Sequence, residues 1–149
     1  MSRRRIRYLT AVSVLTTSFI CYSAVAGADS PEAATHTYAQ NYKDMVLAIC
    51  VANAYKDDKH ASMDAGSSVS ALRDWASYDL EQAPDEIRAL VDSYLARDYH
   101  NPLVESEVKG VRFDFLKCLD LYHSKALDQQ VKELVIHPNR TYRQDNPLP

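Results

Sequence analysis

The sequence predicts an all-α fold, a single-domain bundle of about five helices stapled by one disulfide. Three observations predict it. Apolar residues recur at helical spacing, glycine is too scarce for the many tight turns of an all-β domain, and only two cysteines follow the N-terminal leader. About 120 of the 149 residues follow that leader, which is enough for one domain with one core.

Residues 1–26 are predicted to be a secretory signal peptide. A cluster of four arginines precedes an uncharged, mostly apolar run over residues 8 to 22, and the small residues of SAVAGADS follow. We place cleavage after Ala26, with Ala28 as the alternative. The apolar run is shorter than the roughly 20 residues that a membrane span needs. We therefore expect export to the periplasm rather than a retained membrane anchor.

Cleavage changes the charge of the protein. All 20 acidic residues lie after residue 26, whereas four of the 17 basic residues precede it, so the mature chain carries a net charge of −7. The mature sequence contains no basic stretch of the kind that binds nucleic acid. An acidic surface favours solubility, or electrostatic steering toward a basic protein partner.

Cleavage also changes the cysteine count. Cys21 leaves with the signal peptide, so the exported chain keeps Cys50 and Cys118. Two cysteines in an oxidising compartment have one simple use, a disulfide, and the alternative is a reactive thiol. Closing a loop of this length contributes about 4 kcal/mol to stability by the chain-entropy model.

The helical domain is expected to span residues 27–137, and its first helix lies within residues 36–58. Thr35 or Thr37 can cap its start. A second apolar face makes this helix central to the domain or part of an oligomer interface. The main apolar face is formed by Tyr38, Tyr42, Met45, Val46, Ile49 and Asn53, and the second face by Leu47, Val51 and Ala54.

Four further helices are expected within residues 62–80, 83–99, 110–123 and 125–137. Pro84 opens the second of these in its first turn, and Ser124 can cap the last, which Pro138 ends. Residues 138–149 are predicted to be a flexible tail. The inward stripes of the four helices are Ala65, Val69, Leu72 and Ala76; Ile87, Leu90, Val91, Tyr94 and Leu95; Phe115, Cys118, Leu119 and Tyr122; and Leu127, Val131, Leu134 and Val135.

Two segments interrupt the helical pattern. Residues 56–62 form a polar link between helices. Residues 98–110 are longer than most connections in helical bundles and place apolar residues among acidic ones. Such a loop is either functional or an ordinary crossover whose apolar residues fold back onto the core.

A catalytic site is not indicated. Cys118, Asp120 and His123 lie within six positions. His123 is five residues after Cys118, which is about 500° around a helix, so its side chain points well away from Cys118. Cys118 itself falls on a core stripe, whereas a catalytic thiolate needs an accessible site. Asp120 and His123 form an i, i+3 pair, which is more typical of a hydrogen-bonded surface pair than of a metal site. The five histidines have no ligand spacing, and no phosphate loop or dinucleotide fingerprint is present. We expect a binding protein without catalytic residues, metal or cofactor.

Three segments, YKDMVLAICVANAY, LVDSYLARDY and KCLDLYHSKALD, resemble the type VI secretion amidase immunity proteins, in particular the class that neutralises the fourth family of amidase effectors. The similarity covers residues 38 to 135 and lies in the order and spacing of its motifs. The most specific positions are Lys43, Cys50, Ala54 and Tyr55; Arg97, Asp98 and Tyr99; Lys117 and Cys118; and Leu121, Tyr122, His123 and Ser124.

The resemblance implies a periplasmic, all-helical homodimer without enzymatic activity. Its partner would be a papain-like cysteine amidase that cuts peptidoglycan between D-glutamate and diaminopimelate and is injected by sibling cells. The immunity protein would insert a protruding loop into the cleft of the enzyme and add contacts from a helix of the second protomer. We place that loop at residues 99–109 by its position and length.

Two surfaces are therefore expected to bind the partner. The first is the loop, with Tyr99, His100, Asn101, Pro102, Leu103, Val104, Glu105 and Glu107. The second is the segment 74–82, expected to be helical, with Trp75, Tyr78 and Asp79.

The alternative function is that of a small periplasmic acid-stress chaperone, which would also be a helical, disulfide-bonded dimer. A third hypothesis, an enzyme or metal protein, would use Asp120, His123 and His100.

Overall fold

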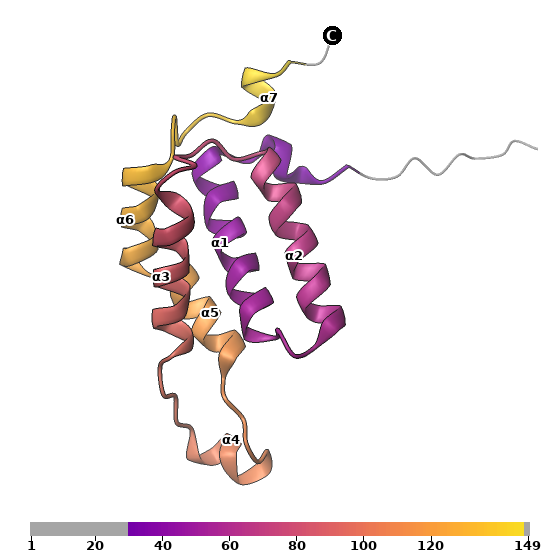
Figure 1. The fold of residues 1–149 in the computed structure, drawn as a ribbon, viewed down its shortest axis with the longest axis vertical. Helices are drawn as coiled ribbons and strands as arrows, with labels where there is room; N and C mark the ends of the chain where they lie inside the picture. The colour runs from indigo at the N-terminus through magenta and orange to yellow at the C-terminus, as the bar shows by residue number, and fades with distance from the viewer. Residues whose placement is uncertain (1–29, 148–149) are drawn as a thin grey trace, which may run out of the picture. The chain divides into compact units, whose positions relative to one another are not determined.

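The computed structural model describes residues 30–147, so the predicted signal peptide lies outside the described residues. Within this range the chain is helical, and no strand longer than an isolated bridge occurs (Figure 1). The elements are η1 (Glu32–Thr35), α1 (Tyr38–Ala54), α2 (Lys59–Asp74), α3 (Ala83–Leu95), α4 (Pro102–Glu107), α5 (Asp114–Tyr122), α6 (Lys125–Leu134) and α7 (Tyr142–Asp145). The five longer helices confirm the predicted all-α bundle. No helix of residues 30–147 has the length and apolar character needed to cross a bilayer.

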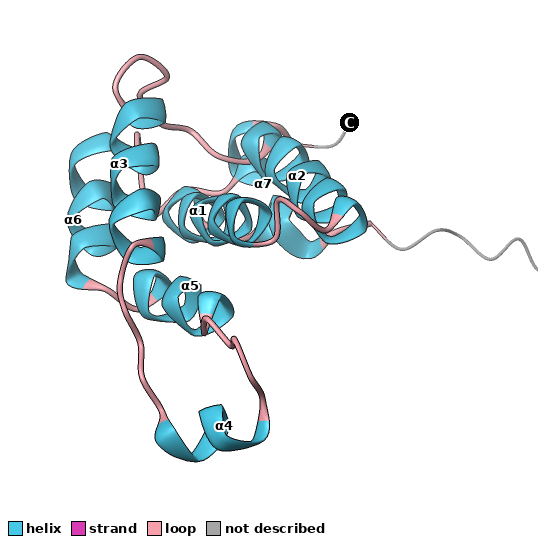
Figure 2. Ribbon diagram, turned by 60° about the horizontal axis from the view of Figure 1, so that its bottom comes forward, coloured by secondary structure: helices cyan, strands magenta, loops and turns pink. Residues whose placement is uncertain are grey.

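Helix α1 is the centre of the bundle. Viewed nearly end-on, it lies between α2 on one side and α3 and α5 on the other (Figure 2). Tyr42, Met45, Val46 and Cys50 are all at most 1% exposed, so most of the main predicted face of this helix lies in the core. Asn53, the last residue predicted for that face, is exposed. The prediction of a central helix with two apolar faces is confirmed, because Leu47 and Val51 also pack against the core cluster.

Side-chain caps fix where the helices begin. Thr37 accepts a hydrogen bond from the Gln40 amide (3.2 Å), and Ser124 accepts one from the Leu127 amide (3.1 Å). Ser124 was predicted as a cap, and Thr37 was one of two predicted candidates, the other being Thr35. Asp58 caps α2, and its carboxylate accepts from the amides of His60 and Ala61 at 3.0 Å. Because of this cap, α2 starts at Lys59, and the predicted polar link of residues 56–62 is wrong over its second half.

Apart from Asp74, the segment 74–82 is not helical, contrary to prediction. Helix α2 ends at Asp74, and the segment that follows pairs with the end of α6: the Ile136 amide donates to the Ser77 carbonyl (2.9 Å), and the Asp79 amide donates to the Leu134 carbonyl (2.9 Å). Tyr78 and Val135 form an isolated antiparallel bridge. This pairing joins residues far apart in the sequence and satisfies backbone groups that a helix would have used.

The prediction for α5 was wrong at one position of its stripe. Cys118 is buried, and Leu119 and Tyr122 are partly buried, but Phe115 is 50% exposed. The buried face instead runs through Lys117, Cys118 and Leu121. A lysine therefore occupies a core position, and a phenylalanine faces solvent.

The C-terminal residues are held against the start of α1. The carbonyls of Arg140 and Pro138 accept from the amides of Tyr38 (2.8 Å) and Ala39 (3.0 Å), which lie in the first turn of α1 and have no intrahelical acceptor. Thr141 and Gln144 form a capping box that begins α7. We predicted a flexible tail over residues 138–149, and the structure adds these contacts over residues 138–147.

The predicted disulfide is present. Cys50 and Cys118 are bonded, with their Cα atoms 5.6 Å apart, and both side chains are fully buried. The bond joins α1 to α5 at the centre of the core. It excludes Cys118 as a free thiol nucleophile in this structure.

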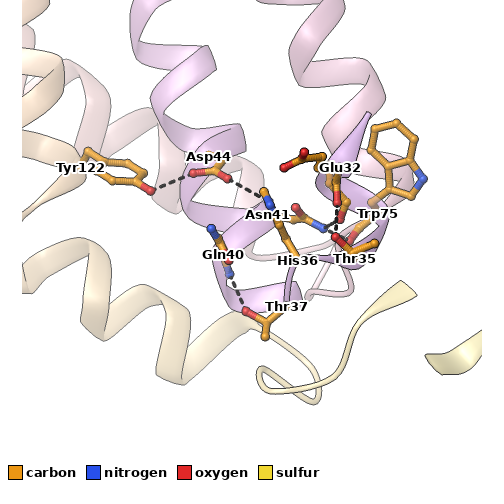
Figure 3. Close-up of polar contacts among 10 residues, drawn as sticks. Glu32, Thr35, His36, Thr37, Gln40, Asn41, Asp44, Trp75 and Tyr122 are labelled. Atoms are coloured by element: carbon orange, nitrogen blue, oxygen red, sulfur yellow. Dashed lines mark hydrogen bonds and ion pairs between the residues drawn. The ribbon is translucent and has the colours of Figure 1, made fainter. Parts of the chain in front are cut away.

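Asn41 links three elements at one end of the bundle (Figure 3). This fully buried amide donates to the Ala33 carbonyl (2.8 Å) and to the Trp75 carbonyl (2.7 Å), so it ties η1 and the end of α2 to α1.

Substitution Asn41→Ala leaves both carbonyls without their donor and should lower the free energy of unfolding by about 2 kcal/mol. Urea denaturation measures this loss. Asn53→Ala, which removes an exposed amide from the same helix, is the control and should change stability by less than about 0.5 kcal/mol. Equal stability of the two variants would contradict the role of Asn41.

Candidate interaction site

The most prominent feature of the bundle is a protrusion formed by residues 98–111. The chain leaves α3, extends away from the other helices, forms α4 at the far end and returns to α5, as both ribbon views show (Figures 1 and 2). Helix α4 has no buried residue. The alternative that this segment folds back onto the core is therefore wrong.

Helix α4 was missed by the sequence analysis, although its start carries clear signals. The Asn101 side chain accepts from the Val104 amide (3.4 Å), and the Glu105 carboxylate accepts from the Asn101 amide (2.6 Å). Pro102 takes the first helical position, where its missing N–H costs nothing. Six residues are too few for a stable isolated helix. These local contacts give the tip of the protrusion a defined shape.

The tip presents apolar side chains to solvent. Leu103 is 82% exposed, Val108 54% and Val104 38%, while Glu107 on the same helix is also exposed. His100 lies between two carboxylates, with Nε2 3.1 Å from Asp98 and Nδ1 3.6 Å from Glu105. The predicted apolar anchors Leu103 and Val104 and the predicted acidic residues are thus brought together on one projecting element.

Further apolar residues lie beside the protrusion and were not predicted as part of the site. Phe115 is 50% exposed, Leu116 46% and Tyr55 38%. They line a hollow of about 380 Å³ at the start of α5, and Leu116 also borders a second hollow, of about 310 Å³, beside Tyr99. Exposed aromatic and aliphatic side chains that adjoin each other are typical of protein-binding surfaces. Only Phe115 was predicted to face the core, and no sequence signal identified Phe115 and Leu116 as exposed neighbours.

The base of the protrusion is fixed by polar contacts. The Tyr99 hydroxyl donates to the Asp120 carboxylate (2.6 Å), and the Lys117 ammonium donates to the Leu95 carbonyl (3.3 Å) and the Asp114 carboxylate (3.0 Å). We call these five residues the base clamp. Tyr99 was predicted to contact a partner, but its hydroxyl is turned back toward α5.

The second predicted surface, residues 74–82, lies at the other end of α3 from the protrusion (Figure 1). The 13 residues of α3 separate the two surfaces by about 20 Å. Tyr78, which was predicted to contact a partner, is only 8% exposed and packs edge-on against Tyr42, with ring centroids 5.4 Å apart. Asp79 caps the turn before α3 by accepting from the Glu81 and Gln82 amides (2.8 and 2.9 Å).

Asp120 and His123, the pair considered for catalysis or metal binding, both contact tyrosines. Asp120 accepts from Tyr99, and the His123 ring packs edge-on against Tyr122 with centroids 5.2 Å apart. Within residues 30–147 no three His, Cys, Asp or Glu side chains gather as a metal site would require. A further hollow, of about 390 Å³, is lined by residues of α1, α2 and α3, among them Ile49 and Ile87.

Comparison with known proteins gives the family. The family model described as "Type VI secretion system (T6SS), amidase immunity protein", Tai4, matches residues 40–131. No curated protein matches the chain. A chain from a structural study of new type VI-secreted toxins and self-resistance proteins in Serratia marcescens has a TM-score of 0.71 at 30% identity, with 85% of this chain and 99% of that chain covered.

A chain from the Tae4/Tai4 effector–immunity system of Salmonella typhimurium has a TM-score of 0.60 at 22% identity. The match covers 70% of this chain and 95% of that chain, and it shows the shared fold. The family match confirms the resemblance read from the sequence and does not support the chaperone alternative. The chain belongs to the family of type VI secretion system amidase immunity proteins.

Proposed function

We propose that this protein binds a type VI secreted peptidoglycan amidase and inhibits it by placing the protrusion in the active-site cleft. The partner would be the papain-like D-glutamate–diaminopimelate endopeptidase that the family resemblance implies. The observation that carries the proposal is the exposed apolar tip on a capped helix, in a chain of this family. The protein would act as a non-enzymatic inhibitor that protects the cell from its siblings.

Physical chemistry supports inhibition by occupation of the cleft. Blocking a cleft requires shape, a few apolar anchors and complementary charge, but no reacting group. Leu103 and Val104 would provide the anchors because their burial against the enzyme removes apolar area from water. Glu105 and Glu107 would face basic groups on the rim of the cleft. The net charge of −7 in the mature chain would steer such an enzyme toward the inhibitor.

We further propose that the protein acts in the periplasm and forms a homodimer. Immunity proteins of this type are periplasmic, and we propose that residues 1–26 direct export and are removed. We also propose a homodimer in which a helix of the second protomer adds contacts to the amidase. Light scattering of the mature protein gives its mass directly, and a monomer at micromolar concentration would remove the dimer from the proposal.

The first test is a calorimetric titration of the mature protein with the amidase encoded beside its gene, together with a muropeptide cleavage assay. We expect nanomolar binding and loss of cleavage at stoichiometric inhibitor. A folded, active amidase that neither binds the protein nor loses activity would overturn the proposed function. Aggregation assays with unrelated proteins at low pH would then test the chaperone alternative.

A matched pair of substitutions decides between the two predicted surfaces. Leu103 at the tip is 82% exposed and Leu80 in the segment 74–82 is 69% exposed, so neither substitution disturbs the core. Leu103→Asp should weaken amidase binding at least about tenfold, because the carboxylate must be desolvated where an apolar anchor was buried. Leu80→Asp should leave the dissociation constant unchanged. The reverse result would move the binding site to residues 74–82.

A further inference from the structure

The protrusion is attached to the bundle by contacts that also determine its direction. It leaves α3 after Leu95 and enters α5 at Asp114, and three side chains of the base clamp cross between these two points. Tyr99 and Asp120 are 21 positions apart in the sequence, and Lys117 lies 22 positions after Leu95. The outgoing and returning ends of the protrusion are therefore held together by side chains, since the disulfide lies deeper in the core.

Lys117 is the centre of the base clamp. Its side chain is only 6% exposed, and its ammonium group contacts the last residue of α3, the first residue of α5 and the Tyr99 ring, whose centroid is 6.0 Å away. Burial of an ammonium group is costly unless it is paired and hydrogen-bonded. Asp114, whose side chain is 10% exposed, provides the charge, and Arg112 adds a second cation 3.0 Å from its other oxygen. An apolar side chain would fill the position of Lys117 equally well if packing were its only role, so the polar contacts of the ammonium group explain the lysine.

Tyr99 fixes the outgoing end. Its hydroxyl donates to Asp120 at 2.6 Å, which is a short bond to a charged acceptor. This hydrogen bond raises the pKa of the Tyr99 phenol, so the phenol keeps its proton and remains a donor at physiological pH. Beside it, the Arg97 guanidinium stacks 3.4 Å above the Tyr94 ring.

The returning end has a backbone of defined shape. Gly110 and Phe113 have left-handed φ angles of 72° and 55°, and Phe113 is the residue that precedes α5. A non-glycine residue in this region is strained and persists only where its surroundings require it. The turn at Phe113 brings Asp114 and Lys117 under the outgoing end.

We infer that Tyr99, Asp120 and Lys117 are positioning residues, which hold the protrusion at the angle required for insertion into the amidase. The inference rests on the proposed function. Without the base clamp, the 14 residues from 98 to 111 would sample many directions. Binding to the amidase would then be weakened by the conformational entropy lost when one direction is selected. With it, the protrusion is already oriented before the partner arrives.

The test compares two tyrosines that make the same kind of bond. Tyr99→Phe removes the hydroxyl that binds Asp120, and Tyr122→Phe removes a hydroxyl that binds Asp44 at 2.8 Å, away from the protrusion. Both variants should show a similar small decrease in the midpoint of urea denaturation. Only Tyr99→Phe should weaken amidase binding, by about tenfold for one lost charge-assisted hydrogen bond. Only Tyr99→Phe should speed amide hydrogen exchange over residues 99–111.

A second pair of variants tests the acceptor. Asp120→Asn keeps an oxygen that can accept from Tyr99 but loses the charge, so it should weaken binding less than Asp120→Ala, which should lose as much as Tyr99→Phe. Unchanged exchange over residues 99–111 in Tyr99→Phe, or equal loss of affinity in Tyr122→Phe, would overturn the inference. Hydrogen exchange needs no amidase, so failure of the base clamp can be told from failure of the proposed function, which would appear as absent binding by the wild-type protein.

Discussion

Replacement of residues 101–105 by a Gly/Ser sequence of equal length should weaken inhibition of the amidase by at least about a hundredfold, a loss of roughly 3 kcal/mol. The replacement removes the Asn101 cap, the proline and both apolar anchors at once. It leaves the core intact, because α4 has no buried residue. Inhibition constants from the muropeptide assay measure the effect, and circular dichroism should change only by the loss of one short helix.

Two outcomes of this replacement are informative. Lost inhibition with an unchanged thermal midpoint would locate the inhibitory element in the protrusion. Unchanged inhibition would contradict the proposal, and residues 74–82 together with the exposed Phe115 and Leu116 would be tested next.

Loss of the disulfide should have the largest effect on stability. The bond joins residues 68 positions apart, and the chain-entropy model assigns a loop of this length about 4 kcal/mol. The double substitution Cys50→Ala and Cys118→Ala should therefore lower the free energy of unfolding by about 4 kcal/mol, out of the roughly 5–15 kcal/mol typical of a domain. Urea denaturation of the variant and of the oxidised wild-type protein gives the difference.

Reduced wild-type protein is the control for this prediction, because it lacks the bond but keeps both buried sulfur atoms. It should unfold at nearly the same urea concentration as the double variant. Titration of free thiols in the denatured mature protein should find none. Two free thiols in protein isolated from the periplasm would contradict the disulfide in the native compartment.

The parts of the fold that were predicted correctly are those specified by local sequence. Thr37 and Ser124 lie directly before amphipathic runs, and such caps mark helix starts wherever they occur. The disulfide followed from the predicted compartment, since the predicted loss of Cys21 with the signal peptide leaves a single pair. The helix caps depend on residues close in sequence, and the disulfide depends on the number of cysteines. Both can be predicted from one sequence.

The parts that were predicted wrongly depend on distant residues. Nothing within residues 74–82 stops a helix; the segment leaves α2 because Ser77 and Asp79 bond to Ile136 and Leu134. Lys117 looks like a solvent-facing residue until the Leu95 carbonyl and Asp114 are placed beside it. The base clamp was missed for this reason. Helix α4 was different, because Asn101 followed by Pro102 is a local start signal that the length of the loop obscured.

The disulfide also determines the covalent connectivity of the molecule. The bond between Cys50 and Cys118 closes a ring of the chain, and the whole protrusion, residues 98–111, lies inside that ring. An exposed projecting loop is where proteases cut most readily. A single cut in α4 would leave Cys50 on one fragment and Cys118 on the other, so the fragments would stay joined. The nicked protein would run as one band on a non-reducing gel and as two on a reducing gel, with Tyr99 and Lys117 on separate fragments yet still linked through one covalent bond.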